Sequence, residues 1–297
     1  MQWRRFVVTA PRPASEAICA IMQHLFGGLS IADTQDNLEH IGYMSLEADH
    51  EAAYQALLTA LHRIPADLAT PDRIAISSDI MDEQDWAEAW KQHYHPIRVT
   101  DRLVIVPPWR PWPDPDSELQ PGPEDILIRI EPGMAFGTGN HATTRLCMEA
   151  LQEYLQPAAR VIDFGCGSGI LTVTACQLGA DTVLALDRDP MCVEVTSRNV
   201  AEIGLSGRCR VQLVEGLADV DEAADLIVAN VTAEVVAAEA IHAARILSTA
   251  GRYIISGFTD RSIHELAAAI EAAGMAVVDT YEESEWCCWV ATKRDAG

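Results

Sequence analysis

Three glycines at every second position, which follow an aspartate, are the residues of this chain best suited to chemistry. In the segment 161–169 a short apolar run reaches Asp163, and Gly165, Gly167 and Gly169 follow before an apolar stretch at helical spacing. This order predicts a buried strand, a tight turn and a helix start. Glycine suits positions of positive φ or close approach to a ligand, and the first N–H groups of a helix lack partners within it. We therefore expect the segment to hold a nucleotide-like molecule against bare backbone.

The glycine spacing narrows the class of ligand. A dinucleotide-binding fold uses G-x-G-x-x-G, with the third glycine three positions after the second. Position 170 of this chain is Ile170, so the pattern is G-x-G-x-G instead. This spacing does not favour a dinucleotide site. A glycine-rich turn without a ligand, in some other α/β protein, remains the alternative.

A second acidic residue follows at the distance that a nucleoside site needs. The apolar run 182–186 ends at Asp187, which lies 22 positions after Gly165. An acid at the end of the second strand, about 20 residues after the turn, can accept hydrogen bonds from ribose hydroxyls. The alternative for Asp187 is a plain loop acid or a helix cap. Asp189, followed by Pro190, is the better candidate for a cap.

Strands and helices alternate along the C-terminal half, which predicts a parallel sheet with helices on both faces. The expected strands after the first two span 210–214, 225–229 and 252–256, and a closing antiparallel pair spans 277–280 and 286–292. The fourth strand ends at Asn230, at the carboxyl edge of the sheet, where such folds place their ligands. We predict an α/β, Rossmann-like, seven-stranded domain over residues 126–297. The alternative for Asn230 is that it only caps the next helix.

The N-terminal part has a different pattern. Residues 1–80 show a β-α-β-β-α-β order, which predicts a small ferredoxin-like α+β domain. Residues 81–125 are assigned to a linker region, with a helix at 82–95, a strand at 99–106 and a proline-rich loop at 111–123.

Composition limits the partners and the compartment. The formal net charge is -23, with 44 acidic and 21 basic residues among 297. Such a balance argues against direct binding of nucleic acid and would attract a basic macromolecule, although solubility alone also explains it. No apolar run is long enough for a membrane span, and no signal peptide is evident. The eight cysteines lack paired C-x-x-C spacing, so we expect reduced thiols, no metal site and a cytoplasmic protein.

A further segment points to one family. Residues 131–144 carry three glycines, Phe136, His141 and the pair Thr143-Thr144. The glycines allow backbone to wrap a ligand, Phe136 can cover an apolar portion of it, and the threonines supply hydroxyls. Together with Asp85-Trp86, Trp90-Lys91, Pro107-Pro108-Trp109, the glycine turn and Val228-Ala229-Asn230, this segment resembles the PrmA-type methyltransferases, a class I S-adenosylmethionine-dependent family. The resemblance extends from Trp3 to Trp286.

The resemblance implies a function and a set of site residues. Such enzymes transfer methyl groups from S-adenosylmethionine to lysine side chains or the N-terminal α-amine of the eleventh protein of the large ribosomal subunit, a basic partner that is free or on the ribosome. It implies cofactor contacts for Thr144, Gly165, Asp187 and Asn230, with Asn230 also beside the transferred methyl group as the catalytic residue. From the residue types in the two glycine-rich segments, we also expect Phe136 and Gly167 to contact the cofactor. The resemblance also implies that the N-terminal domain grips the substrate.

Two other functions remain open at this stage: methylation of another protein or a small molecule, and a non-catalytic cofactor-binding module. The chain departs from the family pattern around Asn140, Ala142, Thr232 and Phe258, which leaves the substrate open. His141 is expected to bond or pack rather than to act as a base. Trp286 is expected to pack in the core, with packing against the cofactor-side loop as the alternative.

Overall fold

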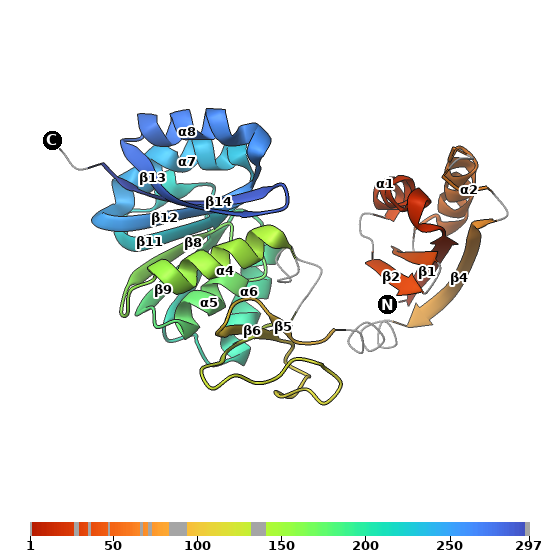
Figure 1. The fold of residues 1–297 in the computed structure, drawn as a ribbon, viewed down its shortest axis with the longest axis horizontal. Coiled ribbons are helices and arrows are strands. Elements are labelled where there is room, and N and C mark those ends of the chain that lie inside the picture. The colour runs from red at the N-terminus through yellow and green to blue at the C-terminus, as the bar shows by residue number, and fades with distance from the viewer. Residues whose placement is uncertain are drawn as a thin grey trace. The chain divides into compact units, whose positions relative to one another are not determined.

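The computed structural model describes residues 2–26, 30–34, 37–46, 48–65, 68–70, 73–82, 94–131 and 141–294. The chain divides into two compact units, Met1–Tyr94 and His95–Gly297, and Figure 1 shows the elements of each. The predicted helix at 82–95 falls mostly on residues 83–93, and Phe136 falls on residues 132–140. Both predictions therefore lie outside the described residues.

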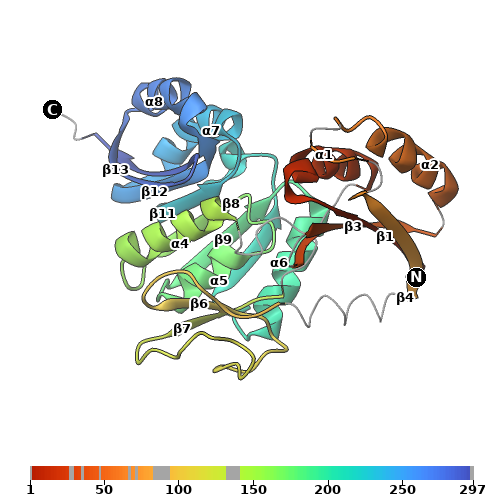
Figure 2. The same cartoon turned by 45° about the vertical axis from the view of Figure 1, so that its right-hand side comes forward.

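The first unit is one antiparallel sheet with two helices. Its elements are β1 (Gln2–Ala10), η1 (Arg12–Ala14), α1 (Ser15–Phe26), β2 (Ser30–Thr34), β3 (Asn37–Ser45), α2 (His50–Leu61) and β4 (Ala75–Asp82). The strand order is β2-β3-β1-β4, and both helices cover the same face of the sheet (Figure 2). Phe6, Ile18, Met22 and Leu57 are fully buried between these layers. The predicted ferredoxin-like arrangement is confirmed.

The second unit is built on a seven-stranded sheet. Its strands are β8 (Arg160–Phe164), β9 (Thr182–Asp187), β10 (Cys209–Leu213), β11 (Ala224–Asn230), β12 (Leu247–Thr259), β13 (Met275–Glu283) and β14 (Trp286–Lys293). The order is β10-β9-β8-β11-β12-β14-β13. The strands β8 to β12 pair in parallel, and β14 pairs antiparallel with both of its neighbours. The predicted five parallel strands with a closing antiparallel pair are confirmed.

Helices cover both faces of this sheet, as Figure 1 shows. One face carries α4 (Ala142–Tyr154), α5 (Ile170–Gln177) and α6 (Pro190–Glu202). The other carries α7 (Ala233–Ile246) and α8 (Ile263–Ala272), and η3 (Leu217–Asp219) and η4 (Asp260–Ser262) are short turns. Two buried apolar clusters result, one on each face, with Val228 in the first and Ile227 in the second. Neighbouring residues of β11 face opposite sides and both are fully buried, as a central parallel strand requires.

A three-stranded sheet precedes the main one. It consists of β5 (Ile97–Arg98), β6 (Leu103–Val106) and β7 (Ile126–Arg129), in the order β5-β6-β7. The predicted continuous strand at 99–106 is wrong, because the N–H of Val99 donates to the carbonyl of Leu103 and closes a turn between β5 and β6. Residues 95–125, assigned to a linker by the sequence analysis, lie in the second unit, where Leu103 belongs to the buried core.

Candidate functional site

The glycine turn joins the end of β8 to the start of α5. Gly165, Gly167 and Gly169 have φ values of 76°, 54° and 83°, a region that favours glycine. A Cβ added at Gly165 would lie 2.3 Å from Cγ1 of Val231. Two independent features therefore require glycine at position 165: its positive φ and the side chain of Val231 that packs against it.

The N–H groups of the turn before α5 find acceptors on β9. The N–H groups of Gly165 and Cys166 both donate to the carbonyl of Leu186 at 2.8 and 3.0 Å, and that of Gly167 donates to Asp187 Oδ2 at 3.0 Å. The expectation of free N–H groups concerned the start of α5 at Ile170, so these bonds do not test it. The acceptor that this region offers to a ligand hydroxyl is the Asp187 carboxylate.

Two polar side chains of α6 hold the turn from behind. Thr196 Oγ1 donates to the carbonyl of Gly167 at 2.9 Å, and Asn199 Nδ2 donates to the carbonyl of Ser168 at 2.8 Å. These two residues are three positions apart, so they lie on the same side of the helix. Both are buried. They fix two carbonyls of the turn that the helix α5 does not use.

Asp187 ends β9 with its carboxylate held in one orientation. Its Oδ2 accepts from Gly167, and its Oδ1 accepts from the N–H of Asp189 at 2.9 Å. A carboxylate offers about four lone-pair sites. The thiol of Cys192 is a third hydrogen-bond partner of Asp187, which leaves acceptor capacity for a ligand hydroxyl. Asp189, not Asp187, caps α6 by accepting from the N–H of Met191, so the cap alternative for Asp187 is wrong.

Asn230 and Thr144 meet across the fold although 86 residues separate them. Asn230 Nδ2 donates to Thr144 Oγ1 at 3.3 Å. This bond leaves the amide oxygen Oδ1 free to accept, and Oδ1 is buried without a hydrogen-bond partner among the described residues. The cap of α7 is Thr232. The alternative that Asn230 only caps the next helix is therefore wrong.

Val231 connects the two groups of predicted residues. Its side chain packs against Gly165, and its backbone lies against Gly257 of β12. Its N–H donates to the carbonyl of Ser256 at 3.1 Å. Thr144, Gly165, Gly167, Asp187 and Asn230 therefore all lie along the carboxyl ends of β8, β9 and β11 and the adjoining start of α4.

Asp163 is fully buried beneath this edge. Its Oδ2 accepts from Thr172 Oγ1 at 2.6 Å, and its Oδ1 has no partner among the described residues. Burial raises the pKa of Asp163 to about 7. The hydrogen bonds from the hydroxyl and the N–H of Thr172 lower this pKa, and the negative charge of the nearby Asp187 raises it.

The Asp163→Asn variant is expected to stabilise the protein more at high pH than at low pH. The folded pKa lies above the ordinary value, so the native state binds the extra proton and stability falls as pH rises from about 4 to about 7. The gain in free energy of unfolding should be roughly 2–3 kcal/mol larger at pH 8 than at pH 5. Urea unfolding at both values measures it, and equal gains at the two pH values would contradict the assignment.

His141 caps α4 and is a neutral group. Thr143 donates to its Nδ1 from the hydroxyl at 2.8 Å and from the N–H at 3.4 Å. Burial lowers the pKa of His141, as does the nearby Arg145, while Glu283 raises it. With Nδ1 acting as an acceptor, the expected bonding and packing role fits this histidine better than that of a base.

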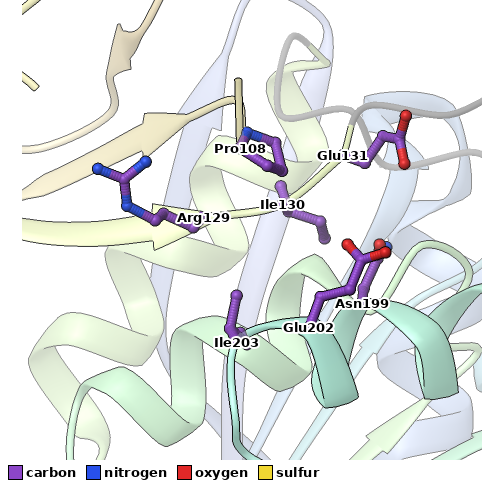
Figure 3. Close-up of a pocket in the computed structure, with 7 residues that line it drawn as sticks. All are labelled: Pro108, Arg129, Ile130, Glu131, Asn199, Glu202 and Ile203. Atoms are coloured by element: carbon purple, nitrogen blue, oxygen red, sulfur yellow. The ribbon is translucent and has the colours of Figure 1, made fainter. Parts of the chain in front are cut away.

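A cavity of about 210 Å³ lies beside the turn, between the end of β7 and α6. Figure 3 shows Asn199 and Glu202 extending from α6 toward Glu131. Of the predicted site residues that the structure describes, none lines this cavity. Asn199 links it to the rear of the glycine turn, so the cavity lies behind the candidate site.

The sequence analysis missed the supporting residues. Thr196 and Asn199 are polar positions on the helix whose cap at Asp189 was expected, and their spacing on one side of it was the available signal. The role of Val231 against Gly257 has no local signal, because the contact joins β12 to the loop after β11. Among the described residues, no group of three or more metal-binding side chains occurs, and no helix is long and apolar enough to cross a membrane.

Comparison with known proteins identifies similar chains over the full length. The family model described as ribosomal protein L11 methyltransferase (PrmA) matches residues 2–294. A ribosomal protein L11 methyltransferase of Pelotomaculum thermopropionicum is 36% identical over 317 residues, which cover 98% of this chain and 99% of the relative. One of an Exiguobacterium species is 33% identical over 319 residues, covering 99% and 100%.

A solved structure is similar to about two thirds of this chain. The crystal structure of a ribosomal protein L11 methylase from Lactobacillus delbrueckii subsp. bulgaricus superposes with a TM-score of 0.61 at 31% identity. It covers 68% of this chain and 100% of that chain.

Proposed function

Because the chain belongs to the PrmA family of ribosomal protein L11 methyltransferases, we propose that it methylates amines of ribosomal protein L11 with S-adenosylmethionine. The observation that carries this proposal is the juxtaposition of an oriented carboxylate, Asp187, with an amide acceptor, Asn230, along one sheet edge. The competing proposal, methylation of another protein or a small molecule, has no comparable observation in its favour.

The described residues fit S-adenosylmethionine. Asp187 retains acceptor capacity for a ribose hydroxyl beside its bonds to Gly167, Asp189 and Cys192. The cofactor contact of Gly165 stays a prediction, because Val231 packs where a side chain at Gly165 would lie. The buried Oδ1 of Asn230 supports a polar partner at the sheet edge. We assign Gly167 to the cofactor contact through the orientation of Asp187, and Thr144 through the orientation of Asn230. Phe136 remains a prediction from the sequence.

The residues of the chain act by binding and positioning. S-adenosylmethionine supplies a methyl group on positively charged sulfur. Asn230 Oδ1 accepts a hydrogen bond from the amine that receives the methyl group. This bond directs the nitrogen lone pair along the line of attack, and such orientation raises the rate of transfer. The amine must be neutral, and removal from water lowers the pKa of a lysine or α-amine. A strong general base is not needed for this step.

Replacement of Asp187 by Ala is expected to weaken S-adenosylmethionine binding by roughly 1–3 kcal/mol, the cost of hydroxyls that lose their buried acceptor. Isothermal calorimetry with S-adenosylhomocysteine measures the change. The matched control is Asp189→Ala, which removes the cap of α6 but no proposed ligand contact. If both variants lose affinity equally, Asp187 acts through the fold and does not contact the ribose.

We assign the first unit to recognition of the ribosomal protein. It forms its own buried core, with Phe6 and Phe26 stacked at 4.8 Å between ring centroids. None of the proposed cofactor residues belongs to it. The net charge of -23, which belongs to the whole chain, favours a basic partner but does not single out this unit. The cytoplasm, where ribosomes and their free proteins occur, is the proposed place of action.

A chain that begins at His95 is expected to bind S-adenosylhomocysteine with nearly the affinity of the full chain and to lose most of its transfer to ribosomal protein L11. Calorimetry and methyl incorporation measure the two properties. Methylation of ribosomal protein L11 at the full rate by residues 95–297 would remove the first unit from substrate recognition.

The proposed function is tested in the source organism by intact-mass spectrometry of ribosomal proteins from a strain that lacks this gene. Ribosomal protein L11 should lose one or more methyl increments, and a plasmid copy of the wild-type chain should restore them. An unchanged L11 mass with a shift in another protein would favour the competing proposal.

A further inference from the structure

Two thiols that the proposed reaction does not use meet near the amino ends of the parallel strands. Cys176 lies one residue before the end of α5, and Cys209 is the first residue of β10. Both are free cysteines, and their Sγ atoms are 2.7 Å apart although 33 residues separate them in the chain. A disulfide needs an S–S distance of about 2.05 Å. Only a small approach of the two sulfur atoms therefore separates this pair from a covalent bond.

The pair lies at an edge of the sheet. Among the described strands, β10 is an edge strand, and it is bonded only to β9. Cys209 is 9% exposed and Cys176 is 1% exposed, while the two residues before Cys209, Gly207 and Arg208, are exposed. The start of an edge strand opens more readily than the centre of a sheet. A small oxidant such as hydrogen peroxide can therefore reach the pair through local opening.

Arg208 places a positive charge beside these thiols. Its guanidinium donates to the carbonyl of Cys176 at 2.9 Å and to that of Ala180 at 3.3 Å. The hydrogen bond from Cys209 lowers the pKa of the Cys176 thiol, and the charge of Arg208 lowers it as well, whereas burial and the charge of Asp163 raise it. The thiolate is the reactive form of cysteine. Cys176 is therefore the sulfur of the pair that reacts first.

A second pair of cysteines lacks these features and serves as an internal comparison. Cys147 of α4 is hydrogen-bonded to Cys288 of β14, and both residues are fully buried. The hydrogen bond with Cys147 raises the pKa of Cys288, as do burial and the charge of Glu149. The strand β14 lies between β12 and β13, so this pair is remote from an edge. We expect it to stay reduced under conditions that oxidise the first pair.

We propose that Cys176 and Cys209 are a site of reversible oxidation, at which a disulfide fastens the edge strand β10 to α5. With hydrogen peroxide as the oxidant, the Cys176 thiolate attacks one peroxide oxygen, and the O–O bond breaks to give a sulfenic acid and hydroxide. The Cys209 sulfur then attacks the Cys176 sulfur, the S–S bond forms, and the S–O bond breaks with loss of a second hydroxide. The protons of the two thiols convert both hydroxides to water. Thiol–disulfide exchange with a reduced dithiol reverses the reaction.

The site is separate from the proposed cofactor contacts. Cys209 pairs with Val183 near the start of β9, whereas Asp187 ends β9 and pairs with Leu213. The disulfide closes a loop that contains β9 and α6, which restricts the unfolded chain. Oxidation is therefore expected to stabilise the second unit without a change in cofactor affinity. This inference does not depend on the identity of the methylated substrate.

The first test treats the full chain with hydrogen peroxide, alkylates the remaining thiols in denaturant and measures the intact mass. The wild type should carry two fewer alkyl groups, dithiothreitol should restore both, and peptide fragmentation should join Cys176 to Cys209. The variants Cys176→Ser and Cys209→Ser should each abolish the change, and the control variant Cys288→Ala should keep it. A wild type that retains all its thiols, or that joins a different pair, would overturn the proposal.

The second test compares the reduced and the oxidised wild type. Oxidation should raise Tm by roughly 5–10 °C, while calorimetry with S-adenosylhomocysteine should give the same affinity for both forms. An unchanged or lower Tm would show that the bond does not fasten β10 to α5, and would overturn that part of the proposal.

The third test measures the rate of disulfide formation in two variants of Arg208. Arg208→Gln should slow the reaction at neutral pH at least about threefold, because the thiolate loses its neighbouring charge, and Arg208→Lys should restore most of the rate. A reduced rate in both variants would indicate a structural effect, and equal rates in Arg208→Gln and the wild type would remove Arg208 from the site.

Discussion

Replacement of Asn230 by Ala is expected to lower kcat at least about tenfold, because about 1.4 kcal/mol of transition-state positioning corresponds to that factor. The amide nitrogen is held by Thr144, and the buried amide oxygen has no hydrogen-bond partner among the described residues. In the proposed reaction this oxygen accepts a hydrogen bond from the amine that is methylated. Single-turnover methyl transfer with saturating cofactor measures the effect free of product release.

Two further variants separate positioning from stability. Thr144→Val removes the hydroxyl that accepts from Asn230 Nδ2 and should lower kcat less than Asn230→Ala, since the amide oxygen remains. Asn230→Asp keeps an acceptor oxygen but adds a charge that would raise the pKa of the amine, so its activity should reach its plateau at a higher pH than that of the wild type. A folded Asn230→Ala protein with wild-type kcat and cofactor affinity would remove Asn230 from the reaction.

The Gly257→Ala variant is expected to lose roughly 3–5 kcal/mol of unfolding free energy, from left-handed backbone strain and from a clash. Gly257 has a φ of 94°, and an added Cβ would lie 2.2 Å from the carbonyl oxygen of Val231 and 2.7 Å from its carbonyl carbon. Backbone on both sides must then move. Because Val231 follows Asn230 directly, kcat should fall as well, by up to about a hundredfold for a shift near 1 Å.

The matched control is Gly274→Ala. Gly274 has a φ of 77°, and an added Cβ would meet nothing within 4 Å, so only the backbone strain of about 1–2 kcal/mol should appear. Urea unfolding and kcat are measured for both variants. Equal stability losses at the two positions, or a Gly257→Ala protein with wild-type kcat, would show that the loop after β11 does not depend on this close approach.

Much of the second unit was predictable because its signals are local. Two of the buried parallel strands, β9 and β11, are short apolar runs that end in a polar residue, Asp187 and Asn230. The glycine turn is predictable for the same reason, since positive φ leaves a trace in residue type. The small sheet was only partly predictable, because the turn between β5 and β6 interrupts a run that reads as one strand.

The contacts that complete the site were not predictable, because they join distant parts of the chain. The Asn230–Thr144 bond links β11 to α4, and the His141–Trp286 contact links α4 to β14. The partners of the turn N–H groups depend on the register of β8 against β9, which sequence does not specify. Residue types identified the candidates, and the topology of the sheet decided which of them meet.

Transfer of methyl groups from S-adenosylmethionine to purified ribosomal protein L11 by this purified chain tests the central claim most directly. Intact-mass spectrometry should show methyl increments on L11 that require the cofactor and that fall sharply with Asn230→Ala, and fragmentation should place them on lysine side chains or the N-terminal amine. An L11 that gains no methyl group, from a folded wild-type enzyme that binds S-adenosylhomocysteine, would contradict the account.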